Sequence, residues 1–313
     1  MKYNSHHINS YSKVPCPLCG SSDANDYTVL YAENIPSQKI NPTIFSARRM
    51  PDKVHYQIVK CKNDSLVRST PILTTECLDM LYTQSKVTYI NEVDNLSKTY
   101  LRALEPILRK LSSNSSILEI GCGSGFMIEA LQNKGFTNTY GIEPSVDAVA
   151  RIKPLLRKNI YNAVFNKKLF SKDQKFDCIY LFQTLDHIPD VSKFIDDCYD
   201  LLHNGGYIFS FHHNVEAVGV SVLGEAHPIF DIEHTQLFSS KTSAAIFEKS
   251  GFLIDAISHP KNVLSLYHLC TLLPLPHYMK KNMLHILERF KILNVSIELP
   301  LGNCSVIAHK PSL

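Results

Sequence analysis

Short apolar strands alternate with helical segments from residue 117 onward, and this alternation limits the fold more than any other feature of the sequence. Apolar runs of strand length lie at 117–120, 139–142, 176–182, 207–211, 252–258 and 305–309. Helical periodicity lies between them, at 126–134, 146–158, 191–202 and 242–250, with a kink expected at Pro154. With a further strand just before Asn162, the pattern predicts an α/β fold in which helices cover both faces of a mostly parallel seven-stranded sheet.

The amino-terminal quarter of the chain has a different texture. It is short on helical periodicity and rich in proline, with strand-like runs at 27–31 and 54–59. We therefore expect a small loop-rich module over 1–75, linking helices over 76–112, and an α/β domain over 113–313. A helical insertion at about 262–292 is expected before the last strand.

A glycine-rich loop follows the first strand of the α/β domain. It reads Glu119-Ile-Gly121-Cys-Gly123-Ser-Gly125 and lies between a buried strand and a helix, where open α/β sheets bind ligands. Glycines let a ligand approach the backbone and the helix amino terminus closely. Glu119 offers a carboxylate to a cationic amino group, and Glu143, which ends the second strand, can accept hydrogen bonds from two ribose hydroxyls.

Four motifs in this order resemble the class I S-adenosylmethionine-dependent methyltransferases. They are LEIGCGSG at 118–125, GIEP at 141–144, FDCIYLFQTLDHIPD at 176–190 and LLHNGGYI at 201–208. The rival, a nicotinamide-binding domain, has the fingerprint G-x-G-x-x-G, whereas this loop reads G-x-G-x-G. The resemblance implies a Rossmann-like methyltransferase core.

The resemblance also assigns the cofactor contacts. It implies that the Gly121–Gly125 loop cradles the methionine part of S-adenosylmethionine, with Glu119 near its amino group. The ribose contact falls on Glu143 and Pro144, the sulfonium end on Phe182 and Gln183, and the adenine near 162–163. The residues assigned to the loop itself are Gly121, Cys122, Gly123 and Gly125. A plain packing role is the alternative for Cys122 and for Phe182.

Nine cysteines are present, an odd number in a chain whose first residues lack the apolar core of a signal peptide, so a disulfide framework is not expected. Cys16-Pro-Leu-Cys19-Gly20 has the form of a zinc knuckle. Similar modules precede the catalytic domain in the bacterial deoxysugar C-methyltransferases that this chain resembles, but here the second knuckle reads Cys61-Lys-Asn-Asp64. We expect a zinc-ribbon-like module with structural Zn²⁺ on Cys16, Cys19, Cys61 and Asp64. His55 or Cys77 as the fourth ligand, or no metal at all, are the alternatives.

Candidate catalytic groups must lie at the carboxyl ends of the strands. In the sugar C-methyltransferases a segment reads Tyr-x-Glu-His, and this chain has Asp231-Ile-Glu233-His234. His234 is therefore the first candidate for a general base, oriented by Glu233. The alternative is a hydrogen bond that only holds the loop. His187, after the fourth strand, is a second candidate.

Two further pairs of residues are candidates for the site. His212 and His213 follow the fifth strand and cannot both face the site if they continue it. Tyr82 and Tyr89, on the linking helices, are expected either to close over the cofactor or to pack within the helices.

Composition narrows the choice of partners. Lys and Arg exceed Asp and Glu by 32 to 29, a net charge of +3 without a basic stripe, which argues against nucleic-acid binding. No apolar run reaches the length of a membrane span, and we expect a cytoplasmic protein. The prediction is methyl transfer to a small molecule, with a sugar nucleotide or glycan precursor as the best guess. An accessory protein without turnover and a nicotinamide oxidoreductase are the alternatives. The insertion at 262–292 is expected to cap the substrate pocket or to form a homodimer face.

Overall fold

A seven-stranded sheet forms the centre of the molecule. The computed structural model describes residues 10–36, 40–45, 52–88, 92–273, 275–290, 292–293 and 295–312. The strand order is β12-β15-β10-β9-β6-β7-β8, and β15 runs antiparallel to both of its neighbours while the other paired strands are parallel. The strands are β6 (Ile117–Ile120), β7 (Thr139–Ile142), β8 (Ile160–Tyr161), β9 (Phe176–Phe182), β10 (Leu202–His213), β12 (Leu253–Ser258) and β15 (Asn303–His309). The predicted mostly parallel seven-stranded sheet is confirmed.

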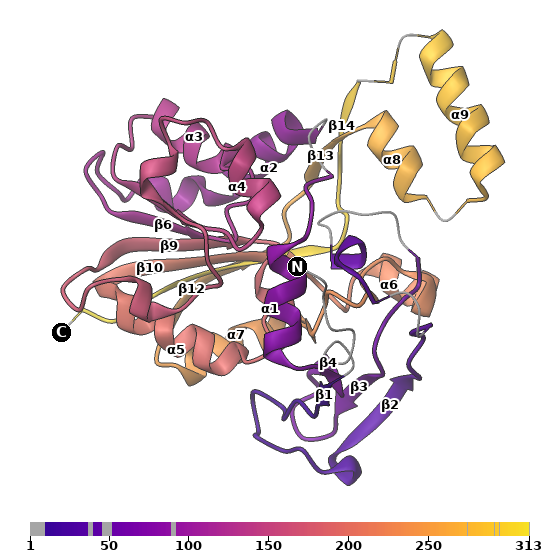
Figure 1. Ribbon diagram of the computed structural model, residues 1–313, viewed down its shortest axis with the longest axis horizontal. Coiled ribbons are helices and arrows are strands. Elements are labelled where there is room, and N and C mark those ends of the chain that lie inside the picture. Colours follow the sequence, from indigo (N-terminus) through magenta and orange to yellow (C-terminus); the bar gives the residue numbers. More distant parts are fainter. Residues whose placement is uncertain are drawn as a thin grey trace, which may run out of the picture.

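Helices cover both faces of this sheet. On one face lie α2 (Val93–Leu108), α3 (Phe126–Asn133) and α4 (Val146–Arg151), and on the other lie α5 (Val191–Leu201) and α7 (Ser240–Lys249), as Figure 1 shows. Each face buries its own apolar cluster, with α2 and α3 packed on one side and α5 and α7 on the other. The buried sheet therefore places the carboxyl ends of its parallel strands along one edge.

The helix expected at 146–158 is shorter than predicted. α4 ends at Arg151, and after Pro154 the chain forms only a 3₁₀ turn at Arg157–Asn159. Proline disfavours helical geometry in the residue before it and has no N–H to donate. The expected kink is thus a helix end.

The insertion before the last strand begins with one strand and ends with another, and the two strands pair with each other. The sequence predicted only helices in this segment. β13 (Asn262–Ser265) pairs antiparallel with β14 (Ser296–Leu299), and α8 (Leu266–Leu272) and α9 (His277–Arg289) lie between them. This strand pair contacts α2, because Thr99 Oγ1 accepts the Val263 N–H at 2.8 Å. Figure 1 shows α8 and α9 standing away from the sheet. The homodimer through this segment stays a prediction. Among the described residues, no helix combines the length and the apolarity that a bilayer crossing requires.

The amino-terminal segment is built into the core. β2 (Tyr27–Tyr31), β3 (Ile58–Cys61) and β4 (Val67–Ser69) form a small antiparallel sheet whose last strand is β11 (Gln236–Leu237), from the far part of the chain. β1 (Tyr11–Ser12) pairs with β5 (Ile72–Leu73), and α1 (Thr75–Thr83) follows. The amino-terminal strands β2, β3 and β4 therefore share a sheet with β11 of the α/β domain, and β11 follows the loop that carries Glu233 and His234.

Candidate active site

The glycine loop between β6 and α3 has the left-handed backbone that glycine favours. The φ angles are +77° at Gly121, +53° at Gly123 and +73° at Gly125. A Cβ on Gly121 would collide with Oγ1 of Thr184, which lies just after β9. Gly121 is thus required both by its backbone angle and by packing between the ends of β6 and β9.

The Glu143 carboxylate is held at the end of β7, beside this loop. It accepts the N–H groups of Gly123 and Ser145, each at 2.8 Å, and the side chain is buried. Burial raises the pKa of Glu143, and these two hydrogen bonds oppose the shift. The Asn162 amide donates to the carbonyls of Glu143 and Pro144, so the turn after β7 is fixed as well.

Glu119 and Cys122 point into the protein around the same loop. The Tyr180 hydroxyl donates to Glu119 at 3.1 Å, and burial raises the pKa of Glu119 well above its usual value. Cys122 is buried in an apolar cluster with Ile128 and Ile152. A cofactor contact by Cys122 would therefore use its backbone, in line with the packing alternative for its side chain.

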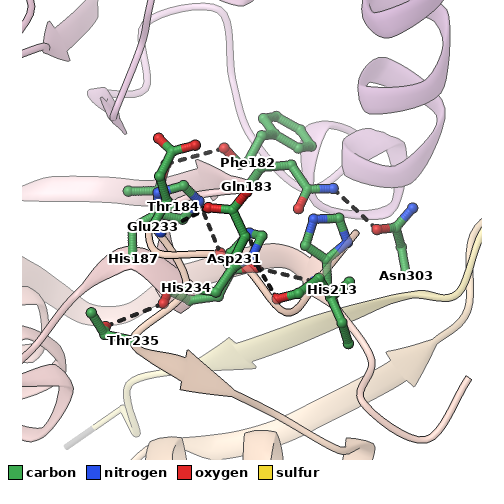
Figure 2. A network of polar contacts seen from close by, with 12 residues as sticks. Phe182, Gln183, Thr184, His187, His213, Asp231, Glu233, His234, Thr235 and Asn303 are labelled. Atoms are coloured by element: carbon green, nitrogen blue, oxygen red, sulfur yellow. Dashed lines mark hydrogen bonds and ion pairs between the residues drawn. The ribbon is translucent and has the colours of Figure 1, made fainter. Parts of the chain in front are cut away.

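Phe182 and Gln183 end β9 in different ways. Phe182 is 7% exposed and stacks on Tyr100 with the ring centres 3.9 Å apart, so most of its ring belongs to the core. Gln183 has a φ of 50°, and its Nε2 donates to Asn303 Oδ1 at 3.0 Å (Figure 2). Among the described residues its Oε1 has no hydrogen-bond partner although it is buried. Asn303, which the sequence analysis did not consider, thus aims Gln183.

A cluster of Asp186, His187 and His234 lies just beyond Gln183. The His187 Nε2 and the His234 Nε2 each lie 3.8 Å from an oxygen of the Asp186 carboxylate. The other ring nitrogens are engaged, because His234 Nδ1 contacts the carbonyl of Ile229 at 2.8 Å and His187 Nδ1 contacts the hydroxyl of Tyr82 at 3.2 Å. The centres of the two imidazole rings lie 4.9 Å apart, and the residues come from different loops.

The charge states in this cluster follow from burial. Burial favours the neutral form of Asp186, but the surrounding histidines, His234 and His187 first, outweigh it and lower its pKa to about 2. Burial lowers the pKa of His187 to about 4, and Asp186 opposes that shift. Asp186 is therefore ionised and His187 neutral at neutral pH.

Of the remaining candidates from the sequence, some lie beside this cluster and others point away from it. His212 points away from the site, to Ser243 at 2.6 Å, while the ring of His213 lies 5.1 Å from that of His234, as strand alternation predicts. The Glu233 N–H donates to Asp231, and the Tyr82 hydroxyl also reaches the Glu233 carbonyl at 3.4 Å. Tyr89 lies outside the described residues.

An open cavity of about 560 Å³ lies next to the turn after Glu143. It is formed where the end of α1 meets the start of α4, and the Ser145 hydroxyl ties the two together by donating to the Ser85 carbonyl at 2.8 Å. The volume is within the range of small-molecule sites. Its lining residues are Met80, Thr83, Gln84, Ser85, Lys86, Val146 and Asp147.

The four predicted metal ligands of the amino-terminal module come together. The ligand atoms of Cys16, Cys19, Cys61 and Asp64 all lie within 4.8 Å of one another. No glycine follows Asp64, yet Ser65 adopts a φ of 68°, close to the 78° of Gly20 after the first knuckle. Both knuckles therefore make the same type of turn.

The alternative fourth ligands lie elsewhere. Cys77 packs in an apolar cluster around α1. His55 contacts Glu225 and the Tyr56 carbonyl. Within the described residues, Asp64 is the side chain that joins the three thiols.

Known proteins are similar to one part of this chain. The family model described as "Methyltransferase domain" matches residues 93–257. The ubiquinone biosynthesis O-methyltransferase of Chelativorans sp. (strain BNC1) is 28% identical over 42% of this chain and 53% of its own length. That of Coxiella burnetii (strain Dugway 5J108-111) is 30% identical over 37% of this chain and 51% of its own. The chain thus spans about half the length of these curated relatives.

Among solved structures, an S-adenosylmethionine-dependent methyltransferase from Archaeoglobus fulgidus matches with a TM-score of 0.47. The two sequences are 16% identical, and the match covers 71% of this chain and 99% of the Archaeoglobus protein. The family match extends over more than half of the 313 residues and includes the glycine loop, Glu143 and the end of β9. The chain therefore belongs to the methyltransferase-domain family.

Proposed function

We propose that the protein binds S-adenosylmethionine at the carboxyl edge of the sheet and transfers its methyl group to a small-molecule acceptor. The observation that carries this proposal is the Glu143 carboxylate, which two backbone N–H groups hold beside the glycine loop. A carboxylate in this position can accept hydrogen bonds from two adjacent hydroxyls, as a ribose presents them. The family match over 93–257 supports the same reading.

The other predicted contacts fit the cofactor. The loop from Gly121 to Gly125 leaves backbone groups near the start of α3, and the buried Glu119 carboxylate lies below it. The Oε1 of Gln183, which has no hydrogen-bond partner within the described part of the chain, is an acceptor at the end where the sulfonium is expected. When bound, S-adenosylmethionine supplies an electrophilic methyl group, and these residues bind and orient it.

The acceptor that we propose is a sugar nucleotide or a related glycan precursor. This choice follows from the resemblance to the deoxysugar C-methyltransferases, in the Glu233-His234 pair and the amino-terminal knuckles. The curated relatives carry the name ubiquinone biosynthesis O-methyltransferase, but they match only the core. We propose that the histidine cluster receives the acceptor, with His234 as the first candidate for the group that activates it and His187 as the second.

We also propose a structural Zn²⁺ on Cys16, Cys19, Cys61 and Asp64. Three thiolates and one carboxylate form a donor set that zinc accepts, and Cys16 and Cys61 are buried. The first knuckle also rests on the core, because Ser192 Oγ donates to the Pro17 carbonyl at 2.8 Å. An ion bound there would hold the two knuckles together and so stabilise the small sheet that includes β11.

Replacement of Glu143 by alanine tests the cofactor site. We expect the dissociation constant for S-adenosylmethionine to rise about 10- to 100-fold, because hydrogen bonds to a charged group contribute roughly 1.5–3 kcal/mol. Isothermal titration calorimetry measures it, with Glu143→Gln as a variant of similar shape and Glu248→Ala, on the exposed side of α7, as the control. A folded Glu143→Ala protein that binds the cofactor as tightly as the wild type would contradict the proposal.

A further inference from the structure

The side chains of Asp186, His187 and His234 form a second group with metal-ligand chemistry. One ligand atom from each lies within 4.8 Å of the other two. We propose that these three residues bind a divalent transition-metal ion, and that this ion holds and activates an oxygen atom of the acceptor. The inference rests on the proposed methyl transfer and names the group that activates the acceptor.

The distances in the cluster suit an ion between the side chains. Each imidazole Nε2 lies 3.8 Å from a carboxylate oxygen of Asp186. This is longer than an N–H···O hydrogen bond, which spans about 2.7–3.2 Å. It is shorter than the sum of two metal–ligand bonds of about 2.0–2.2 Å each. The two distances run to different oxygens of the carboxylate, and each pair has room for an ion between the nitrogen and the oxygen. Because the ligand atoms of all three side chains lie within 4.8 Å of one another, the pairs surround the same space.

The second nitrogen of each ring has the partner that metal-bound histidines require. His234 Nδ1 contacts the Ile229 carbonyl at 2.8 Å, and because a carbonyl only accepts, Nδ1 carries the proton. In the neutral ring, Nε2 then directs a lone pair at Asp186. His187 Nδ1 is likewise held, by the Tyr82 hydroxyl at 3.2 Å. Such outer hydrogen bonds fix the tautomer and the ring orientation of metal ligands.

The Asp186 carboxylate supplies an independent observation. Asp186 is 1% exposed, and among the described residues its Oδ1 has no hydrogen-bond partner. The other oxygen, Oδ2, accepts the His213 N–H at 3.4 Å. A buried carboxylate oxygen without a partner is costly, and the lone pair that His234 Nε2 directs at this carboxylate raises the cost further. A cation at this point would satisfy the carboxylate and both nitrogens.

The donor set and the position define the ion and its role. Two imidazoles and one carboxylate suit Zn²⁺, Mn²⁺ or Fe²⁺ better than Ca²⁺ or Mg²⁺, and three protein ligands leave positions open for substrate. The site begins three residues after Gln183, and Thr184 packs against Gly121 of the cofactor loop.

The chemistry is an ordinary displacement. The ion lowers the pKa of a bound acceptor hydroxyl, whose proton leaves to solvent. The oxygen then forms a bond to the methyl carbon while the carbon–sulfur bond breaks and its electron pair stays on sulfur. In this arrangement His187 and His234 act as ligands rather than as free bases.

Titration with Mn²⁺, followed by the electron paramagnetic resonance signal of the free ion, tests the site. Mn²⁺ is chosen because it prefers nitrogen and oxygen to the thiolates of the amino-terminal cluster. We expect the wild type to bind one Mn²⁺ per chain. His234→Gln and Asp186→Asn should each bind it at least about 10-fold more weakly. His285→Gln, exposed on α9, is the matched control and should bind as the wild type does.

Two results would overturn the inference: no Mn²⁺ bound by the wild type, or unchanged binding by folded His234→Gln. If Asp186→Asn fails to fold by circular dichroism, His187→Gln takes its place. S-adenosylmethionine binding is measured by calorimetry on the same samples. Cofactor binding without Mn²⁺ binding removes only the metal site, whereas loss of both removes the proposed function as well.

Discussion

Replacing His234 with glutamine is expected to lower kcat for methyl transfer about 10²- to 10⁴-fold, the range over which positioned catalytic groups act. His234 is 8% exposed, its Nδ1 is fixed by Ile229, and its Nε2 faces Asp186. Glutamine keeps a polar side chain of moderate size but removes the imidazole. The loss should follow whether the ring takes a proton itself or holds an ion.

The same variant should bind S-adenosylmethionine normally, because the cofactor contacts that we propose lie on β6, β7 and β9. Single-turnover formation of S-adenosylhomocysteine, measured with a competent acceptor, gives the rate, and calorimetry gives the cofactor affinity. His285→Gln again serves as the control for removal of a histidine. A kcat within about threefold of the wild type would mean that His234 only holds the loop.

The second large effect is expected at the cysteine cluster. Cys61→Ser should contain one zinc ion fewer per chain than the wild type, and its free energy of unfolding should fall by about 3 kcal/mol or more, because metal binding and folding are coupled in such modules. Cys61 is 2% exposed and belongs to the apolar cluster on the α5 face of the central sheet, so the loss of stability should extend beyond the amino-terminal module. Elemental analysis by mass spectrometry counts the zinc, and urea denaturation measures the stability.

Cys77→Ser is the matched control for this prediction. It removes another buried thiol, on α1, that lies in a separate apolar cluster, so its zinc content should equal that of the wild type. Asp64→Cys should retain the zinc with a four-thiolate site. Equal zinc in Cys61→Ser and the wild type would rule out the cysteine site.

Much of the fold could be predicted because its signals are local. The alternation of strands and helices, the glycine loop and the acidic end of β7 are each contained in a few consecutive residues. The helix end before Pro154 was also a local signal, but the sequence analysis took it for a kink. The strand β13 was missed because Asn262–Ser265 has no strong pattern of its own and pairs with β14 more than 30 residues later.

The candidate site depends on contacts between distant segments, so less of it could be predicted. His187 and His234 were candidates from their places in the sequence. That Asp186 faces both of them follows only from the folded chain, in which the Thr235 N–H donates to the Asp186 carbonyl at 2.8 Å. Asn303 reaches Gln183 across 120 residues, and no motif marks it.

The turn after Asp64, in the second knuckle, is another feature that the sequence pattern alone did not predict. A glycine is the expected signal for a left-handed turn, and none follows Asp64. Ser65 nevertheless adopts that backbone, and the Leu66 N–H donates to Asp64 at 2.9 Å. The surrounding hydrogen bonds, which a sequence pattern does not include, hold the turn.

The most direct test of the account is transfer of a labelled methyl group from S-adenosylmethionine to a panel of acceptors. The panel should include sugar nucleotides, phenols and small amines, and the products are identified by mass spectrometry. We predict one methyl group added to a sugar nucleotide, with one S-adenosylhomocysteine formed for each, and less product from Glu143→Ala at a cofactor concentration that does not saturate this variant. Stoichiometric cofactor binding by the wild type, with neither S-adenosylhomocysteine nor a methylated product from any acceptor, would contradict the account and favour an accessory protein.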